Sequence, residues 1–384
     1  MKNICVIVNK YPNEVDPSGL VFVQQLVWAM ADKGIKMSVI CPLSVNLNFK
    51  YSRIPYKKIE MTENNNEVEV YFPKFIGFGQ SHRILGKSPA PLTTNLFTKS
   101  VRKVISKMEE KPDVVYGHFV TPAGITAARM GRELNIPSFM AHGESTNWSI
   151  ENFGASEVAK ELESLAGVVA VSGRNKDLLL DERIVTESLI KVFPNGYRKE
   201  RFYPRDKKES REKFGFEEDD FIVGFVGSFD DRKGVLRLEK AVENTRNVNF
   251  ACAGKGKLVP TSSKCLFAKP INNEELPYFY SAVDVFVLPT LNEGCCNAII
   301  EALACGTPVI SSDKPFNNEI LDETCSIKIN PESVEEIQQA IEKLHEDKKL
   351  RDSLAKGSIE KAKTLTLEKR AENIIKFISE RKDI

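Results

Sequence analysis

The sequence lacks the cysteine and histidine spacing that indicates a metal site or a disulfide framework. None of its eight cysteines forms a C-x-x-C pair, and its four histidines are scattered at positions 82, 118, 142 and 345. Most of the cysteines stand in apolar runs, where a free thiol behaves as a small hydrophobe. We therefore expect no bound metal or other cofactor, a reducing environment and a cytoplasmic location.

Charge of one sign and long hydrophobic runs are also missing. Lys and Arg number 54 against 53 Asp and Glu, a net charge of +1, so no overall field attracts nucleic acid. No apolar run has the roughly 18 residues of a membrane-spanning helix. The first apolar stretch, Ile4 to Val8, is too short for the core of a signal peptide and predicts a buried strand.

The composition that remains is typical of a soluble globular protein, with 42% hydrophobic and 28% charged residues. At roughly 150 residues per domain, a chain of 384 residues holds about two domains. Short apolar runs alternate with segments of helical period, a pattern typical of parallel sheets with helical crossovers. The predicted fold class is α/β, with two Rossmann-like doubly wound domains.

The first half of the chain contains one complete series of alternating elements. Strands are predicted at 4–8, 37–41, 68–72, 114–117, 138–141, 168–171 and 190–193, and helices at 18–33, 94–110, 121–135, 155–165 and 173–180. Asn64-Asn65-Asn66 indicates a hairpin loop.

A second series begins at residue 221. Its strands are predicted at 221–227, 249–253, 264–267, 283–288, 308–311 and 326–329. Asn272 and Glu275 have the spacing of a capping box at the start of a helix.

The apolar pattern is interrupted between the two series. Pro194-Asn195-Gly196 and the charged stretch that follows, with Pro204 inside it, place a hinge near residues 194–205. The predicted domains are residues 1–197, completed by a C-terminal helix at 366–384, and residues 198–365. Two such domains are expected to face each other across a cleft.

The first strand of the second series is followed by a loop of glycines and charges, Gly227 to Gly234, that contains Arg232 and Lys233. A phosphate would find backbone N–H groups and positive charge together at the start of the next helix. The loop lacks the spacing of a Walker motif. A plain turn with a solvated charge cluster is the alternative.

Glu301 is a carboxylate within an apolar helical segment, predicted at 297–305. A buried carboxylate needs partners, and a ligand rich in hydroxyls would supply them. Glu293 precedes it by eight positions, on the order of 12 Å if the segment were helical. Eight positions also turn the pair away from a common helix face, so we expect the loop before the helix to present Glu293. The alternative is that a neighbouring cation holds Glu301.

At these residues the sequence resembles glycosyltransferase family 4, a group of retaining, nucleotide-sugar-dependent enzymes with the GT-B fold. Glu293 to Glu301 matches the E-x7-E motif of that family, and Ala304-Cys305-Gly306-Thr307-Pro308-Val309 matches its continuation. Pro194-Asn195-Gly196 resembles the interdomain segment, and Ala253-Gly254-Lys255-Gly256 resembles the turn on the nucleotide side.

The resemblance implies donor-binding roles for several residues. Glu301 would bind the ribose, and Lys233 the diphosphate. Glu293 would hold the hydroxyls of the transferred sugar together with the segment at Gly294, Cys295, Cys296 and Asn297. Gly227 and Gly254 would belong to the nucleotide side. The family usually has Arg where this chain has Ser228, and Arg232 or the backbone would compensate for its loss.

The resemblance also implies roles in the first domain. Gly19, in the Asp16-Pro17-Ser18-Gly19 loop, would let the backbone approach the phosphates. His118 matches a histidine that faces the reaction centre, although a lone histidine at a strand end is more often structural. His142 and Glu144 would line the acceptor side.

The implied reaction is a hexosyltransferase reaction with retention of the anomeric configuration. A UDP- or GDP-linked sugar would pass to a hydroxyl acceptor in cell-surface polysaccharide or glycolipid synthesis. Lys233 would stabilise the leaving diphosphate without a metal. The alternatives are a sugar-nucleotide epimerase and a non-catalytic two-domain sugar-binding protein.

The expected acceptor is a sugar or a lipid-linked sugar. Residues 74–111 carry eight Lys and Arg against Glu109 and Glu110, a local balance of +6, and begin with the apolar Phe75-Ile76-Gly77-Phe78-Gly79. Such a surface suits contact with anionic lipid at the inner face of the membrane. The alternative is a solvated helix at 94–110 whose apolar side packs inward.

Overall fold

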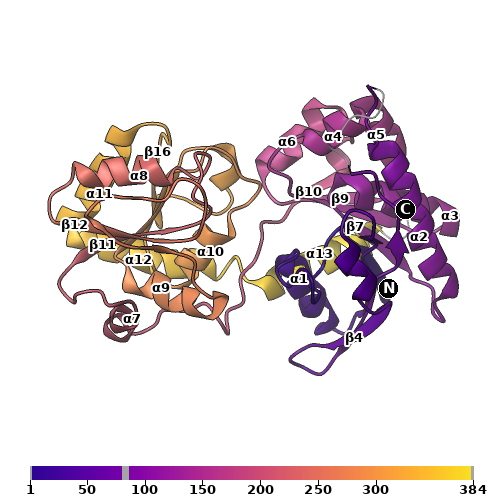
Figure 1. Ribbon diagram of the computed structural model, residues 1–384, viewed down its shortest axis with the longest axis horizontal. Coiled ribbons are helices and arrows are strands. Elements are labelled where there is room, and N and C mark those ends of the chain that lie inside the picture. The colour runs from indigo at the N-terminus through magenta and orange to yellow at the C-terminus, as the bar shows by residue number, and fades with distance from the viewer. Residues whose placement is uncertain (1, 80–85, 382–384) are drawn as a thin grey trace. The chain divides into compact units, whose positions relative to one another are not determined.

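A computed structural model describes residues 2–79 and 86–381 of the chain (Figure 1). The chain divides into two compact units, Met1–Phe193 with Arg370–Ile384 and Pro194–Lys369. The expected boundaries lay after residues 197 and 365. The last three residues of the expected C-terminal helix lie outside the described residues.

Unit 1 is built on an eight-stranded sheet in the order β10-β9-β8-β7-β1-β2-β5-β4. All its pairs are parallel except β4 with β5. The strands are β1 (Asn3–Ile7), β2 (Lys36–Ile40), β4 (Lys57–Met61), β5 (Glu67–Tyr71), β7 (Val114–His118), β8 (Ser138–His142), β9 (Gly167–Ala170) and β10 (Ile190–Val192). A separate pair, β3 (Leu43–Ser44) and β6 (Lys74–Phe75), lies outside this sheet.

The helices of unit 1 follow the predicted alternation, with shifted bounds and one additional helix. They are α1 (Val21–Ala31), α2 (Ala90–Lys107), α3 (Ile125–Leu134), α4 (Trp148–Phe153), α5 (Ala155–Leu162), α6 (Gly173–Asp181) and α13 (Leu367–Arg381). The predicted helix at 18–33 begins only at Val21, because Asp16 to Gly19 forms a turn and Leu20 has a left-handed backbone. The short helix α4 was not predicted.

The edge strand β4 was also missed by the sequence pattern. Lys57, Ile59 and Met61 point to solvent, so its hydrophobic residues are not those that face the core. As predicted, Asn64-Asn65-Asn66 forms the hairpin loop, here between β4 and β5. An exposed, lysine-bearing edge of this kind is common where a sheet ends.

Unit 2 contains a six-stranded, fully parallel sheet in the order β13-β12-β11-β14-β15-β16. Its strands are β11 (Phe221–Val226), β12 (Val248–Ala253), β13 (Cys265–Lys269), β14 (Val285–Leu288), β15 (Val309–Ser312) and β16 (Ser326–Ile329). Its helices are α7 (Lys207–Phe214), α8 (Val235–Glu243), α9 (Leu276–Ala282), α10 (Asn297–Ala304), α11 (Val334–Glu346) and α12 (Lys348–Ala362). The capping box at Asn272 and Glu275 is present as predicted.

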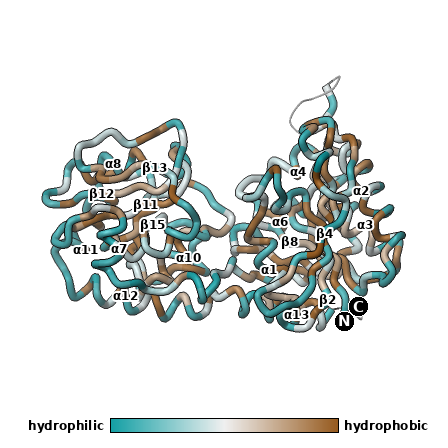
Figure 2. Tube along the Cα trace, turned by 60° about the horizontal axis from the view of Figure 1, so that its bottom comes forward, coloured by the Kyte–Doolittle hydropathy of each residue, from teal (hydrophilic) through white to brown (hydrophobic). Residues whose placement is uncertain are grey.

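Helices cover both faces of the unit 2 sheet, with α8 and α11 on one face and α9, α10 and α12 on the other (Figure 1). In both units the hydrophobic residues follow the strands and the inner sides of the helices (Figure 2). In unit 1, Phe377 of α13 packs edge-on against Phe139 of β8 and Phe193. The C-terminal helix therefore completes the core of the first unit.

Candidate active site

The strand order of unit 2 places two distant loops side by side. The sheet runs outward in both directions from the β11–β14 pair, so the loops after these strands diverge to opposite faces. In doubly wound sheets ligands bind at this switch point, outside the carboxyl ends of the strands. Here the two loops are residues 227–234 and 289–296.

The loop after β11 is a closed turn that carries the predicted cations to the start of α8. Asp230 accepts hydrogen bonds from the Lys233 backbone N–H at 2.9 Å and from the Ser228 hydroxyl at 2.5 Å. Gly234 ends the turn with φ +79°, and a side chain there would strike the Pro289 carbonyl of the second loop. A side chain at Gly254 would collide with the Gly227 carbonyl. Glycine is thus required where these backbones meet.

Glu293 is held by both cations of the first loop. Its Oε1 lies 2.6 Å from Lys233 Nζ and 2.5 Å from Arg232 Nη1. The Thr290 hydroxyl donates to the same oxygen at 3.2 Å. As expected, Glu293 lies in the loop, because α10 begins only at Asn297. The two positive charges and the acid form one cluster at the switch point.

Lys233 is charged in this cluster although it is largely buried. Burial alone would lower the pKa of Lys233, but the nearby Cys296 and Glu293 outweigh it and raise that pKa. The Cys296 sulfur lies 3.9 Å from Nζ, at the N-cap of α10. Burial raises the pKa of the Cys296 thiol despite the lysine. At neutral pH the thiol is therefore uncharged, and the Glu293 carboxylate stabilises the ammonium; the Cys296 thiolate adds to this effect only at higher pH.

Glu301 lies on α10 and accepts a hydrogen bond from the hydroxyl of the fully buried Tyr280, at 2.9 Å. Burial raises the pKa of Glu301 to about 7, although Tyr280 and the charge of Arg201 act against this rise. Among residues 2–79 and 86–381, no cation lies within ion-pair distance of Glu301. The alternative prediction, that an ion pair with a neighbouring cation holds Glu301, is therefore wrong.

Three further residues help to form this site: Thr290 and Tyr280, which the sequence did not point to, and Asn195, which was expected only in the hinge. Thr290 and Tyr280 orient Glu293 and Glu301. Asn195 donates to the Asn297 side chain at 2.9 Å, and its backbone N–H points at the Cys295 sulfur at 3.4 Å. The Pro-Asn-Gly turn was the signal for Asn195. A buried tyrosine before an apolar strand carries no comparable signal.

Unit 1 has its own switch point, between β1 and β7. The loop with Gly19 follows β1, and His118 is the last residue of β7. The His118 ring is buried against Tyr116, with centroids 5.0 Å apart. Burial, reinforced by the charge of Arg370, lowers the pKa of His118 to about 3. His118 is therefore neutral at physiological pH.

His142 and Glu144 form a hydrogen-bonded pair at the end of β8. His142 Nδ1 lies 2.8 Å from a Glu144 oxygen. The other Glu144 oxygen accepts from the Ser149 hydroxyl at 2.8 Å, so the carboxylate is fixed from two sides. A histidine oriented by a fixed carboxylate has a defined ring position and tautomer.

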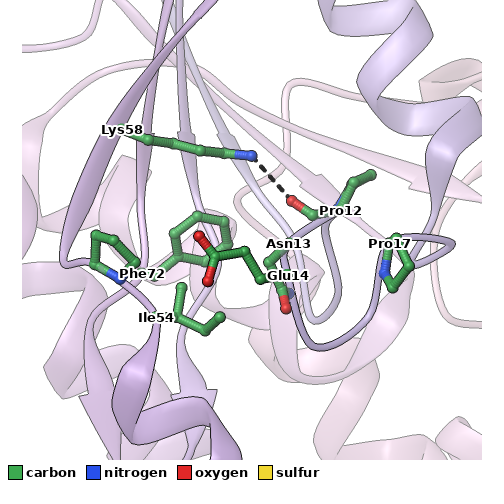
Figure 3. A pocket seen from close by; sticks show the side chains of 8 residues that line it. Pro12, Asn13, Glu14, Pro17, Ile54, Lys58 and Phe72 are labelled. Carbon is green, nitrogen blue, oxygen red and sulfur yellow. Dashed lines mark hydrogen bonds between the residues drawn. The ribbon is translucent and has the colours of Figure 1, made fainter.

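A cavity of about 340 Å³ lies beside the loop after β1 (Figure 3). Lys58 crosses one side and donates to the Pro12 carbonyl at 3.1 Å, as Figure 3 shows. Its ammonium also pairs with Glu60 at 2.6 Å. The lining consists of Pro12, Asn13, Glu14, Pro17, Ile54, Pro55, Lys58 and Phe72. Mostly apolar walls with few charged groups are typical of a small-molecule pocket.

Two further features bear on the kinds of site present. In the described part of the chain, no three His, Cys, Asp or Glu side chains are grouped as metal ligands. Nor does any helix within residues 2–79 and 86–381 combine the length and apolarity needed to cross a bilayer.

Comparison with protein families accounts for nearly the whole chain. The model described as "Glycosyltransferase Family 4" matches residues 20–201, and that described as "Glycosyl transferases group 1" matches residues 206–361. The chain is therefore a glycosyltransferase of the GT-B type. Residues 20–201 match the model of the family that the E-x7-E motif resembles. Because both models describe glycosyltransferases, the alternative predictions of a sugar-nucleotide epimerase and of a non-catalytic sugar-binding protein are wrong.

The names of relatives agree with this class. The chain is 25% identical to the Bacillus subtilis protein named "Putative teichuronic acid biosynthesis glycosyltransferase TuaC", over 87% of either chain. It is 28% identical to the Escherichia coli "UDP-Gal:alpha-D-GlcNAc-diphosphoundecaprenol alpha-1,3-galactosyltransferase" over 57% of this chain and 62% of that protein.

Two solved structures show the same fold. The sucrose-phosphate synthase of Thermosynechococcus elongatus superposes with a TM-score of 0.74, at 18% identity and 99% coverage of both chains. Anabaena HepE, solved in complex with UDP-glucose, superposes with a TM-score of 0.71, at 14% identity, over 99% of this chain and all of that one.

Proposed function

We propose that the protein transfers a sugar from a nucleoside-diphosphate sugar to an acceptor hydroxyl, with retention of the anomeric configuration. The observation that carries the proposal is the cluster at the β11–β14 switch point. There, Arg232 and Lys233 both pair with the Glu293 carboxylate. The helix α10, which carries Glu301, begins four residues after Glu293. The two cations suit a diphosphate, the Glu293 carboxylate suits the hydroxyls of a sugar, and the Glu301 carboxylate suits those of a ribose.

The diphosphate is expected to take over the two cations. Glu293 pairs with both Lys233 and Arg232, so these three groups together carry one net positive charge. A diphosphate carries more negative charge than one carboxylate and would compete for both. Glu293 would then be released to accept hydrogen bonds from the sugar hydroxyls, with the backbone of Gly294 and Cys295 beside it. Arg232 would thereby replace the arginine lost at Ser228.

Glu301 would hold the ribose. Its ionised carboxylate can accept hydrogen bonds from both ribose hydroxyls, while Tyr280 keeps one oxygen in place. UDP is the favoured nucleotide, because the Escherichia coli relative is named for UDP-Gal and HepE was solved with UDP-glucose. GDP is the alternative that the experiment below includes.

In the proposed reaction, Lys233 and Arg232 stabilise the diphosphate as it leaves the sugar. Negative charge grows on the diphosphate as the glycosidic bond to it breaks, and cations already in place lower that barrier. Lys233 is the principal group, and its raised pKa keeps it charged. We expect turnover without an added metal, since Lys233 and Arg232 supply the positive charge.

The acceptor is expected at unit 1. His142, fixed by Glu144, is a candidate for orienting the acceptor hydroxyl, and the neutral His118 could only act as a hydrogen-bonding group. The cavity beside the β1 loop offers apolar walls to a sugar face or to the start of a lipid. The name of the Escherichia coli relative contains a diphosphoundecaprenol-linked acceptor and favours a lipid-linked acceptor here. The teichuronic acid biosynthesis in the name of TuaC favours cell-surface polysaccharide or glycolipid synthesis.

Incubation with a panel of UDP- and GDP-sugars tests the proposal. We expect slow release of UDP or GDP from one donor, accelerated by a lipid-diphosphate-linked sugar acceptor. Nuclear magnetic resonance of the product would give the anomeric configuration. Inversion would refute the retaining mechanism, and the absence of nucleotide release from every donor would refute the proposed donor class.

A further inference from the structure

Five exposed apolar side chains gather on one part of unit 1. They are Leu47, Phe49, Ile76, Phe78 and Leu92, which we name the apolar platform. Phe49 is 69% exposed, Leu47 59% and Ile76 56%. Single exposed apolar residues are ordinary, but a contiguous group on a folded surface marks an interaction site.

Hydrogen bonds tie together the three segments that carry the platform. The Asn46 side chain donates to the Gly77 carbonyl at 2.7 Å and accepts from its N–H at 3.0 Å. The Phe78 N–H donates to the Thr93 hydroxyl at 3.1 Å. Leu47 and Phe49 follow Asn46, Ile76 and Phe78 flank Gly77, and Leu92 precedes Thr93. The platform is therefore a built surface rather than a set of loose loops.

The charges on the segments that carry the platform are all positive. The nearby acids on other segments are Asp16, whose charge acts on Tyr51, and Glu14, which lines the cavity with Ile54 and Pro55. Lys50, Arg53, Lys87 and Lys99 are exposed, and none has an ion-pair partner among residues 2–79 and 86–381. No Asp or Glu occurs anywhere in residues 42–59 or 72–108. A group of exposed cations without ion-pair partners, beside exposed apolar side chains, is the chemistry that binds an anionic lipid surface.

This surface differs from the basic segment 74–111 expected from the sequence. The Lys74 ammonium is buried, Arg102 pairs with Glu133 at 2.5 Å, and Lys111 donates to carbonyls at the end of α2. Arg83 lies outside the described residues. The apolar side of α2 packs inward, as the alternative reading of that helix predicted. The segment 45–53, which was not expected to contribute, carries the most exposed apolar side chain of the platform, Phe49.

We propose that the apolar platform docks the protein on a bilayer that contains anionic lipid. Phe49, Leu47 and Ile76 enter the boundary between headgroups and acyl chains, and the surrounding Lys and Arg side chains contact the phosphates. The chain that carries Phe49 continues directly into Ile54 and Pro55, which line the cavity beside the β1 loop. Where the proposed function holds, a lipid-linked acceptor could pass from the bilayer to that cavity.

Co-sedimentation with vesicles tests the docking without donor or acceptor, so its result is independent of transfer activity. We expect the protein to bind vesicles of phosphatidylcholine with phosphatidylglycerol and to dissociate from them at high salt. It should not bind vesicles of phosphatidylcholine alone. Phe49→Ser with Ile76→Ser should weaken binding by roughly tenfold or more. Lys50→Glu with Arg53→Glu should weaken it by a similar factor.

The matched control is Ile59→Ser with Met61→Ser, which removes two exposed apolar side chains from β4, outside the platform. It should bind vesicles like the unchanged protein, and all variants should keep their thermal midpoint. Equal vesicle binding by the platform variant would overturn the proposal. So would a platform-dependent dimer in sedimentation velocity without vesicle binding, because the surface would then join two copies.

Discussion

The Lys233 ammonium lies 2.6 Å from the Glu293 carboxylate, although the two residues belong to loops after different strands. The pairing exists because β11 and β14 are neighbours in the sheet. It keeps a largely buried lysine charged and aimed at the place where we expect the donor diphosphate. The same contact joins the first acid of the E-x7-E motif to the loop after β11.

Replacement of Lys233 tests whether this cation stabilises the leaving diphosphate. Lys233→Ala should lower kcat by about 100- to 1,000-fold, the usual effect of removing one group that stabilises transition-state charge. Lys240→Ala, an exposed lysine on α8, is the control and should leave kcat unchanged. Near-normal turnover of Lys233→Ala would remove the lysine from the mechanism.

Truncation of Glu301 tests the proposed ribose contact. Glu301→Ala should weaken donor binding by roughly 1.5 to 3 kcal/mol, the range for hydrogen bonds to a charged group. Isothermal titration calorimetry with the donor found by the release assay measures this directly. Donor affinity equal to that of the unchanged protein would contradict the assignment.

Donor binding should also depend on pH through Glu301. Its pKa of about 7 lies above the ordinary 4.5, so the unliganded carboxyl is mostly protonated below neutrality. Ribose hydroxyls donate to the ionised form, and affinity should therefore rise roughly tenfold from about pH 6 to about pH 8. An intact nucleotide sugar is the right ligand, because its diphosphate does not titrate in this range. Glu301→Gln should bind weakly and without this pH dependence.

Tyr280 should act on the donor only through Glu301. Its hydroxyl lowers the pKa of Glu301, so Tyr280→Phe should move the midpoint of the pH dependence upward while keeping the ring packing. Affinity at high pH should change little, because the carboxylate is then ionised in both proteins. A midpoint that stays in place would show that Tyr280 is only a packing residue.

A buried ion pair should control the stability of unit 2. Arg211 donates to the Asp284 carboxylate at 2.9 Å and to the Ala282 carbonyl at 3.0 Å, and both charged side chains are buried. Asp284 also pairs with the half-exposed Lys207 at 2.5 Å and accepts from the Ile222 N–H at 2.8 Å. Arg211→Ala should lower the free energy of unfolding by about 3 kcal/mol, because it removes the buried partner of Asp284 and leaves only these two contacts. Lys208→Ala, whose partner Glu218 is exposed, should cost under about 1 kcal/mol in the same denaturation assay.

The sequence by itself determined the α/β class, the strands of both sheets apart from the edge strand β4 and the short β3 and β6, and the local chemistry of caps and loops. These follow from short-range rules: buried parallel strands are apolar throughout, and the spacing of Glu293 and Glu301 is visible in the chain. The strand β4 was not predicted because its apolar residues, Ile59 and Met61, lie on the exposed side, while Lys58 and Glu60 face inward.

Only the tertiary structure decided which of these residues meet. The strand order puts the loop with Lys233 beside the loop with Glu293, and no local pattern encodes a neighbour across a sheet. Burial beneath other elements sets the pKa of Glu301 near 7 and that of His118 near 3. The apolar platform likewise arises where three separate segments are tied together, since exposure is a property of the packed chain and not of any one stretch of it.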